Sequence, residues 1–508
     1  MTAAGMRLQT PLIHGIAWCG GLFAFSLLLS TCANRMYGKM KVNDFLDSNK
    51  NLNMTEGKPF GLIMRFALPL FIESVFQQVY NMVDSIVVGQ FVGKNALAAV
   101  GGSGAAYNLI IALVTGFSTA ASVLLAQAYG SGDNEQVRKS FATSIAMIMA
   151  TGGALMAVGL ASCGELLYLL GTPSDVLPDA TIYLRTICAG VLATSLYNAM
   201  SSCLRAVGDS VTPLVALIVA SLLNVTLDVL FVVSFGMGVF GVAIATVISQ
   251  LVSGLYCLVY ALCRTEAFHF RREELGGNVF IDRAIIREIF RIGIPSALSS
   301  AIVVISAMFM QRAVNQFGSD AAAAYAAGNR TEQIFMCLSF SIGMAIGTFC
   351  GQNIGAREYE RVKEGMRCGY LINLIYTVVM GVIMFFFAPQ VIGIFTDSSQ
   401  VVKIGVPMVR ITAVFAPVLG FVFIFQNFLR SASDIAPTIW MSGCEIGARS
   451  VLSFVFAAIA GYFGVWWATP IGWTGSALIG LLRYRGGKWK IKCEAAQNRL
   501  KEQKRCKE

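Results

Sequence analysis

The chain has 508 residues, of which 56% are hydrophobic and only 13% charged, about half the charged fraction of a typical soluble domain. Because a membrane span needs about 20 apolar residues, this length holds about a dozen helices and excludes a hidden soluble catalytic domain. The net charge of +10 lies in alternate loops between apolar stretches, a pattern of membrane orientation that argues against a nucleic-acid partner. We expect no strands, because the alternating pattern of a closed barrel is missing.

The chain begins with an apolar run that stands apart from the rest. Residues 12–32 follow a short basic start and are similar to a signal-peptide core or an extra anchor. A polar stretch separates them from Met54, which is itself a natural start. We therefore interpret residues 1–53 as an N-terminal extension, either a leader or a start assigned too far upstream.

Hydropathy then predicts twelve membrane-spanning helices in two sets of six. The first set lies near residues 62–88, 97–127, 136–162, 178–206, 211–235 and 239–263, and the second near 284–313, 322–352, 361–388, 404–431, 436–460 and 464–483. Basic residues on alternate loops place both termini of this core in the cytoplasm, as a multi-pass protein of the cytoplasmic (inner) membrane.

The two sets repeat each other at an offset of 226 to 223 residues. RFALPL at 65–70 returns as RIGIPS at 291–296, AQAYG at 126–130 as GQNIG at 351–355, and the Leu204-Arg205 pair as Leu429-Arg430. Two like membrane halves are typical of secondary transporters, in which one half rocks against the other around a shared cavity. The sequence therefore predicts an all-α membrane protein with twelve transmembrane helices in two pseudo-symmetric six-helix lobes. These lobes span 54–263 and 284–490, with a cytoplasmic linker at 264–283 and a cytoplasmic tail at 491–508.

The first predicted span carries a polar stripe. Its members, at i, i+4, i+7 and i+11, share one helix face and are Glu73, Gln77, Tyr80 and Asp84. One acidic side chain at mid-bilayer costs about 2.5 to 3.5 kcal/mol, so such residues usually face a wet cavity on an ion or substrate path. A hydrogen bond between helices remains the alternative.

The fifth span repeats this logic. Asn224 and Asp228 stand at i and i+4, so their oxygens point the same way and are placed to share a sodium ion or a proton. Thr246 in the next span is positioned to add a hydroxyl ligand.

The internal repeat separates coupling residues from structural ones. It carries Glu73 onto Ser299, Asp84 onto Met310 and Asp228 beside Leu452, so these acids exist in the first half only. We therefore expect ion coupling in the N-terminal lobe. The second half has charges of its own, for which mutual pairing is the default and substrate contact the alternative; they are Arg330, Glu332, Glu445 and Arg449.

Several motifs resemble one transporter family. They are P-x-x-x-E with Y-N-x-V-D-x-x-x-V-G at 69–89, AQAYGSGDNEQVRK at 126–139, LLGTPSDVLPDA at 169–180, LRAVGDSVTPL at 204–214 and RYRGGKWK at 483–490. Together they are similar to the multidrug and toxic compound extrusion (MATE) transporters from Met54 to Lys490. The resemblance implies two lobes forming a V, and export of organic cations driven by H+ or Na+.

The resemblance also assigns roles. Asp84, Asn224, Asp228 and Thr246 match the ion-coupling residues of the bacterial and archaeal branch, and they are the metal ligands if the ion is Na+. Glu73, Gln77, Tyr80, Arg330, Glu332 and Glu445 are left as cavity or substrate residues. We expect a monomer in membrane lipid, without cofactors.

Two other classes of protein are alternatives to a drug transporter. A flippase for lipids or lipid-linked oligosaccharides shares the architecture but favours a larger and strongly basic cavity. A membrane-embedded enzyme needs a set such as HExxH, Ser/His or paired Asp in its spans, which the sequence lacks, and no Walker motif indicates ATP as the energy source.

The interpretation of residues 1–53 as an extension can be tested by removing them. A chain that begins at Met54 keeps all twelve predicted spans and every motif above, so we expect it to insert into the membrane and to transport. Expression of the truncated chain, followed by membrane fractionation and dye efflux, checks this. Loss of insertion, or a mature chain cleaved and acylated at Cys32, contradicts it.

Overall fold

The computed structural model describes residues 52–169, 172–269 and 281–505, and these contain helices and no strand. The helices of the first half are α3 (Pro59–Val87), α4 (Lys94–Gly130), α5 (Asn134–Leu169), α6 (Leu177–Ala189), α7 (Val191–Ala206), α8 (Val211–Val229) and α9 (Gly238–Arg264). Those of the second half are α10 (Arg283–Asn315), α11 (Ser319–Gly355), α12 (Tyr359–Phe386), α13 (Ala388–Gly393), α14 (Ser399–Ser431), α15 (Ala436–Gly447) and α16 (Ser453–Arg485), followed by α17 (Lys488–Arg505).

The number of spans agrees with the expected twelve once two irregular segments are resolved. Ten helical stretches of the described residues are long and apolar enough to cross a membrane, or eleven if α6 and α7, bent by 46°, form one span. The last stretch, Ala436–Arg485, has 50 residues, about twice the length that one span needs. Its backbone leaves the helix at Ala460 and at Gly461, where φ is +63°, a value that glycine adopts without strain. The stretch therefore supplies two spans.

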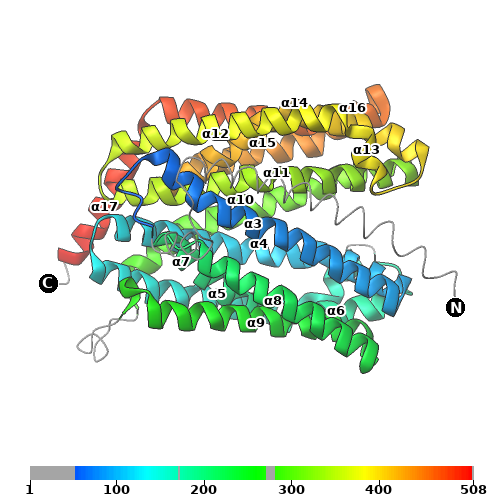
Figure 1. The fold of residues 1–508 in the computed structure, drawn as a ribbon, viewed down its shortest axis with the longest axis horizontal. Coiled ribbons are helices and arrows are strands. Elements are labelled where there is room, and N and C mark those ends of the chain that lie inside the picture. Colours follow the sequence, from blue (N-terminus) through cyan, green and yellow to red (C-terminus); the bar gives the residue numbers. More distant parts are fainter. Residues whose placement is uncertain (1–51, 170–171, 270–280, 506–508) are drawn as a thin grey trace, which may run out of the picture.

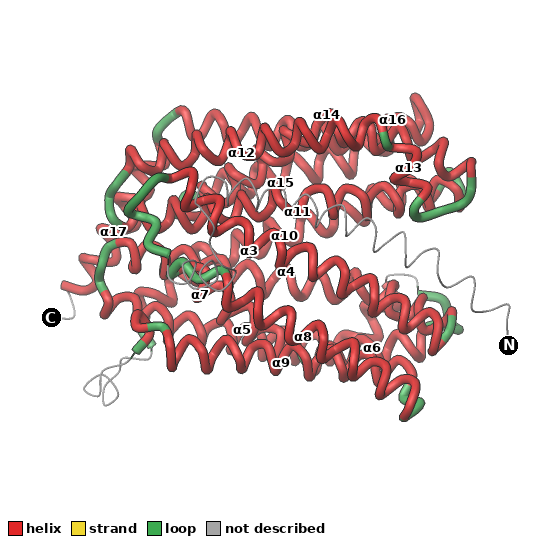
Figure 2. The backbone as a smooth tube through the Cα atoms, in the orientation of Figure 1, coloured by secondary structure: helices red, strands yellow, loops and turns green. Residues whose placement is uncertain are grey.

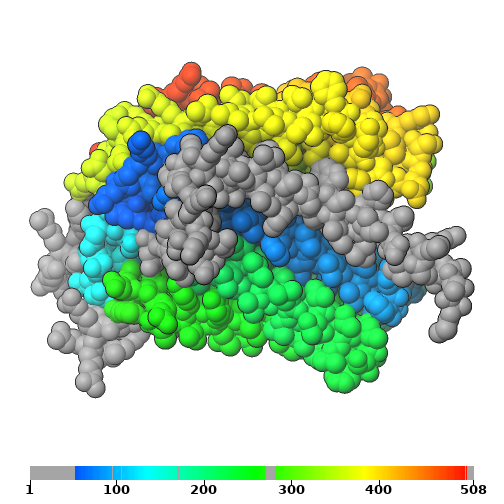
Figure 3. Space-filling model, in the orientation of Figure 1, coloured from blue at the N-terminus to red at the C-terminus, as the bar shows by residue number. Residues whose placement is uncertain are grey.

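The two halves form two layers, with their first helices crossing between them. Figure 1 shows α12, α14 and α16 in one layer and α5, α8 and α9 in the other, with α3 running between, and the tube in Figure 2 shows the same helical layers. Helix α3 packs against α8 of its own half and against α11 and α12 of the other half. Helix α10 does the reverse, packing against α15 and against α4. In the space-filling view, residues of α3 lie between the two layers (Figure 3).

This crossing is built into the hydrophobic cores. Ile63 and Phe66 at the start of α3 belong to the core of the second half, and Ile285 and Ile289 of α10 belong to the core of the first half. The seam between α4 and α10 is tight, since a Cβ on Gly116 would lie 2.3 Å from the backbone nitrogen of Ala297. Each half therefore completes its core with the first helix of its partner.

The segments outside the twelve spans are packed where they are described. Most of the predicted extension, residues 1–51, lies outside the described residues, but Leu52 donates its N–H to the Gly208 carbonyl at 3.1 Å and Met54 is fully buried. Phe268, in the predicted linker, stacks on Phe141 of α5 with ring centres 4.0 Å apart. The domain boundaries at 53 and 264–283 stay predictions, and the truncation at Met54 also removes the Leu52 contact.

Candidate ion and substrate site

Two carboxyl groups from different helices meet inside the first half. Asp84 lies near the end of α3 and Asp228 near the end of α8, and the packing of these helices brings their carboxyls within hydrogen-bonding reach. The Oδ1 atoms of both residues are buried and have no hydrogen-bond partner among the described residues. Buried polar atoms are normally paired, so two orphaned carboxylate oxygens indicate a place for a proton or a cation.

Amide and hydroxyl groups complete this site. The Asn224 amide has one orientation in which both its nitrogen and its oxygen have a partner. In this orientation it donates to Asp228 Oδ2 at 3.1 Å and accepts from the Thr246 N–H at 3.2 Å. The Tyr80 hydroxyl lies near the Thr246 side chain. The structure thus brings Asp84, Asn224, Asp228 and Thr246 together with Tyr80, although these residues come from three helices.

Irregular turns follow the buried charges. The π-helical segments Val88–Val92 and Leu230–Ser234 begin shortly after Asp84 and Asp228, and a third, Ala448–Leu452, contains Arg449. Single π turns are frequent at functional sites, because they release backbone groups from the regular ladder. The three π-helical segments therefore lie beside Asp84, Asp228 and Arg449.

The described residues contain no group of three or more His, Cys, Asp or Glu side chains that could hold a metal ion. A cation in the first half would therefore have two carboxylates, with amide and hydroxyl oxygens beside them. This all-oxygen set suits a hard cation and not a transition metal.

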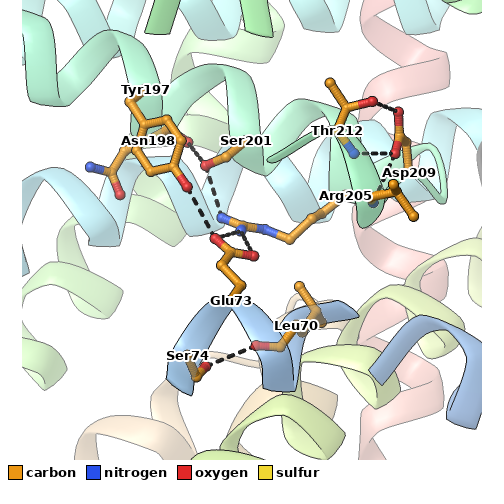
Figure 4. Close-up of polar contacts among 10 residues, drawn as sticks. Leu70, Glu73, Ser74, Tyr197, Asn198, Ser201, Arg205, Asp209 and Thr212 are labelled. Carbon is orange, nitrogen blue, oxygen red and sulfur yellow. Dashed lines mark hydrogen bonds and ion pairs between the residues drawn. The ribbon is translucent and has the colours of Figure 1, made fainter. Parts of the chain in front are cut away.

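Glu73 belongs to a second polar site on the same helix. Its carboxylate accepts hydrogen bonds from Arg205 at 3.1 and 3.3 Å and from the Tyr197 hydroxyl at 3.1 Å. Arg205 also donates to Ser201 Oγ at 2.9 Å (Figure 4). Asp84 lies eleven positions after Glu73 on α3, a rise of about 16 Å. The polar stripe therefore holds a neutralised ion pair at one end and uncompensated acids at the other, with Gln77 half-buried between them.

Sequence reasoning did not identify Arg205 as the partner of Glu73. The repeat shows only that the two residues differ in their counterparts. Arg205 corresponds to Arg430, whereas Glu73 corresponds to Ser299. In the second half, Nε of Arg430 is buried without a hydrogen-bond partner among the described residues. Within the described residues, an arginine common to both halves thus has an acidic hydrogen-bond partner in the first half only.

Three of the four charged residues of the second half are neighbours, because Glu332 lies within electrostatic range of both Arg449 and Glu445. Arg449 and Glu445 form an ion pair at 3.2 Å, so mutual pairing is confirmed for these two. Arg330 is exposed. Glu332 lines a small pocket together with Gly328, Thr331, Phe335, Met384, Val409, Thr412 and Ala413.

These features define a class of protein. An all-helical chain of two like halves, with apolar helices long enough to span a bilayer and buried acids between them, has the architecture of a secondary transporter. The sequence matches the profile of the MatE family over residues 69–230 and again over 295–465, one match in each half. The chain belongs to this family, the multidrug and toxic compound extrusion transporters.

Relatives and solved structures agree with this assignment. The chain is 28% identical over 434 residues to the probable multidrug resistance protein YoeA of Bacillus subtilis (strain 168), covering 84% of this chain and 93% of that protein. It is 27% identical over 447 residues to the probable multidrug resistance protein NorM of Thermotoga maritima, covering 87% and 95%.

The fold matches solved transporters at low sequence identity. A MOP superfamily transporter from Pyrococcus furiosus superposes with a TM-score of 0.79 at 23% identity, covering 88% of this chain and 98% of that one. An outward-facing MATE family transporter gives a TM-score of 0.78 at 24% identity, covering 88% and 99%. The predicted two-lobe, all-α membrane fold is confirmed.

The Glu73–Arg205 pair provides a test of the site's electrostatics. We expect Arg205→Leu to lose about 3 to 5 kcal/mol of stability, because it leaves a largely buried carboxylate without its cation. The double variant Glu73→Leu/Arg205→Leu should stay closer to wild type, since replacing both partners leaves no unpaired charge. Thermal unfolding in detergent measures both. Lys139→Leu, which breaks the exposed pair with Glu135, is the control and should change little. A double variant as unstable as Arg205→Leu contradicts the interpretation.

Proposed function

We propose that the protein is an antiporter of the cytoplasmic membrane that exports organic cations and takes up H+ or Na+ in exchange. The observation that carries the proposal is the Asp84–Asp228 pair, whose two Oδ1 atoms are buried and have no partner in the part of the chain that the structure describes. Two neighbouring carboxylates repel each other, and a proton or a cation relieves this repulsion. An ion bound between the two carboxylates therefore offsets the negative charge of Asp84 on α3.

Helix α3 is placed to transmit this change in charge to the contact between the two halves. It bears Asp84 and Glu73, and it packs against both halves. Neutralisation of Asp84 and Asp228 removes the reason for this end of α3 to face water. The helix then has two arrangements, one for each charge state, as coupling between ion and substrate requires.

The substrate class rests on the acids and on the relatives. YoeA and NorM are both described as probable multidrug resistance proteins, which supports a drug-like cargo. Glu332, in the pocket of the second half, offers a negative charge beside the apolar side chains Phe335 and Met384, a combination that suits an organic cation. Glu445, Tyr80 and Gln77 are further candidates, and exposed Arg330 would lie at the rim.

A lipid or lipid-linked oligosaccharide flippase is the alternative. The buried and unpaired Nε of Arg430 is the observation in its favour, because it suits an anionic group. The unpaired acids of the first half favour cation coupling.

Asp84 is the residue that tests the coupling site. We expect Asp84→Asn to abolish gradient-driven efflux while leaving insertion intact, because asparagine keeps the shape but carries neither a charge nor a transferable proton. Dye efflux from proteoliposomes, with H+ and Na+ gradients imposed in turn, measures this and identifies the ion. Full activity of a well-expressed Asp84→Asn protein would rule out the assignment.

The two halves provide matched controls. Asn224→Ala and Asp228→Asn should weaken coupling, whereas apolar exchanges at the repeat positions of Asp228 and Asp84 in the second half, Leu452→Val and Met310→Leu, should be tolerated. Binding of a fluorescent cation between pH 5 and 9, with and without sodium, should show competition with the ion, and by linkage the cation should weaken ion binding by the same factor. Ion dependence that survives both changes in the first half would place the site elsewhere, with Glu332 and Glu445 as the next candidates.

A further inference from the structure

Two glutamines related by the repeat close the seam at the end of the molecule where α17 lies. Gln127, near the end of α4, donates to the Ser431 carbonyl at 2.7 Å and to Ser433 Oγ at 3.3 Å. Gln352, near the end of α11, donates to the Ala206 carbonyl at 2.9 Å. Ala206 and Ser431 are the last residues of α7 and α14, where carbonyls lack a partner within the helix. Each glutamine thus caps a helix of the opposite half.

Two glycines allow the halves to approach this closely. A Cβ on Gly130 would lie 1.9 Å from the Gln352 carbonyl oxygen, and one on Gly355 would lie 2.0 Å from the Gln127 carbonyl oxygen. Both distances are far below van der Waals contact. The seam is therefore a contact of backbone with backbone, and the Q-x-x-G spacing that both halves share supplies the glutamine and the space together.

A strap formed by Leu52–Gly57 lies over one side of this contact. Leu52 N donates to the Gly208 carbonyl at 3.1 Å, and Met54 N donates to Gln352 Oε1 at 2.9 Å. Asn353 and Arg361 donate to the Met54 carbonyl at 3.0 and 3.3 Å. The strap thus joins the α7–α8 turn of the first half to α11 and α12 of the second. The Gln352 amide connects the strap, α7 and α11 at one point.

We propose that Gln127 and Gln352 form one gate, which opens and closes as a unit at the cytoplasmic end, and that Leu52–Gly57 is its latch. The cytoplasmic placement rests on the orientation proposed above. A transporter must separate its halves at this end in every cycle. A seam held by a few hydrogen bonds suits that task, because each bond shifts the equilibrium by only about tenfold or less.

Hydrogen exchange of the full-length protein tests whether the two sides open together. Among the described residues, Gln127 makes no hydrogen bond to the strap. If the gate is one unit, Gln127→Ala raises the population of the open seam, and amides of residues 52–57 exchange roughly tenfold faster. Gln333→Ala, an exposed glutamine on α11, is the matched control and should leave the strap unchanged. Faster exchange confined to residues 431–434 would overturn the proposal, because it shows a local cap only.

The glycines give a second and independent test. Gly130→Ala places a methyl group against the Gln352 backbone and should expose the strap in the same way. Gly102→Ala in the same helix has no atom within 4 Å of the added Cβ and should not. Unchanged exchange in both Gly130→Ala and Gln127→Ala would overturn the gate. These measurements require neither an ion gradient nor a substrate, so failure of the antiport proposal and failure of the gate are distinguishable.

Discussion

The exchange of the first helices between the halves is the constraint on which the rest of the structure depends. Helix α3 buries Ile63 and Phe66 in the core of the second half, while its later turns pack on α8 of the first. Because neither half completes its core alone, the halves cannot drift apart freely, and any relative motion must move α3 and α10. Charge added to or removed from α3 therefore acts on both halves at once.

The charges on α3 are arranged in two sites with opposite requirements. At Glu73 the negative charge is neutralised by Arg205, and this ion pair stabilises the contact between α3 and α7. At Asp84 the neighbouring charged group is another acid, Asp228, and the Oδ1 atoms of both are buried without a hydrogen-bond partner among the described residues. One helix thus carries a paired acid and an unpaired acid, separated by about 16 Å.

The internal repeat is followed by the backbone more closely than by the side chains. Asp209 accepts from the N–H groups of Val211 and Thr212, whereas its counterpart Asp434 pairs with Arg483 at 2.6 Å. The glutamines Gln127 and Gln352 keep their role in both halves, because the helix end that each one caps is the same in both. The glutamines thus keep equivalent roles in the two halves, whereas the aspartates do not.

The sequence by itself determined the all-helical membrane fold, the two halves and the face shared by Glu73 and Asp84, because hydropathy, duplication and helical periodicity are local properties of the chain. It also indicated the acids of the first half, since an acid inside an apolar span is visible without a structure. Only the tertiary structure decided that Glu73 is paired and Asp84 is not, that Arg330 is exposed while Glu332 lines a pocket, and that Gln127 and Gln352 reach across the seam. These outcomes depend on which helices become neighbours, and neighbours hundreds of residues apart are selected by the packing of the whole chain.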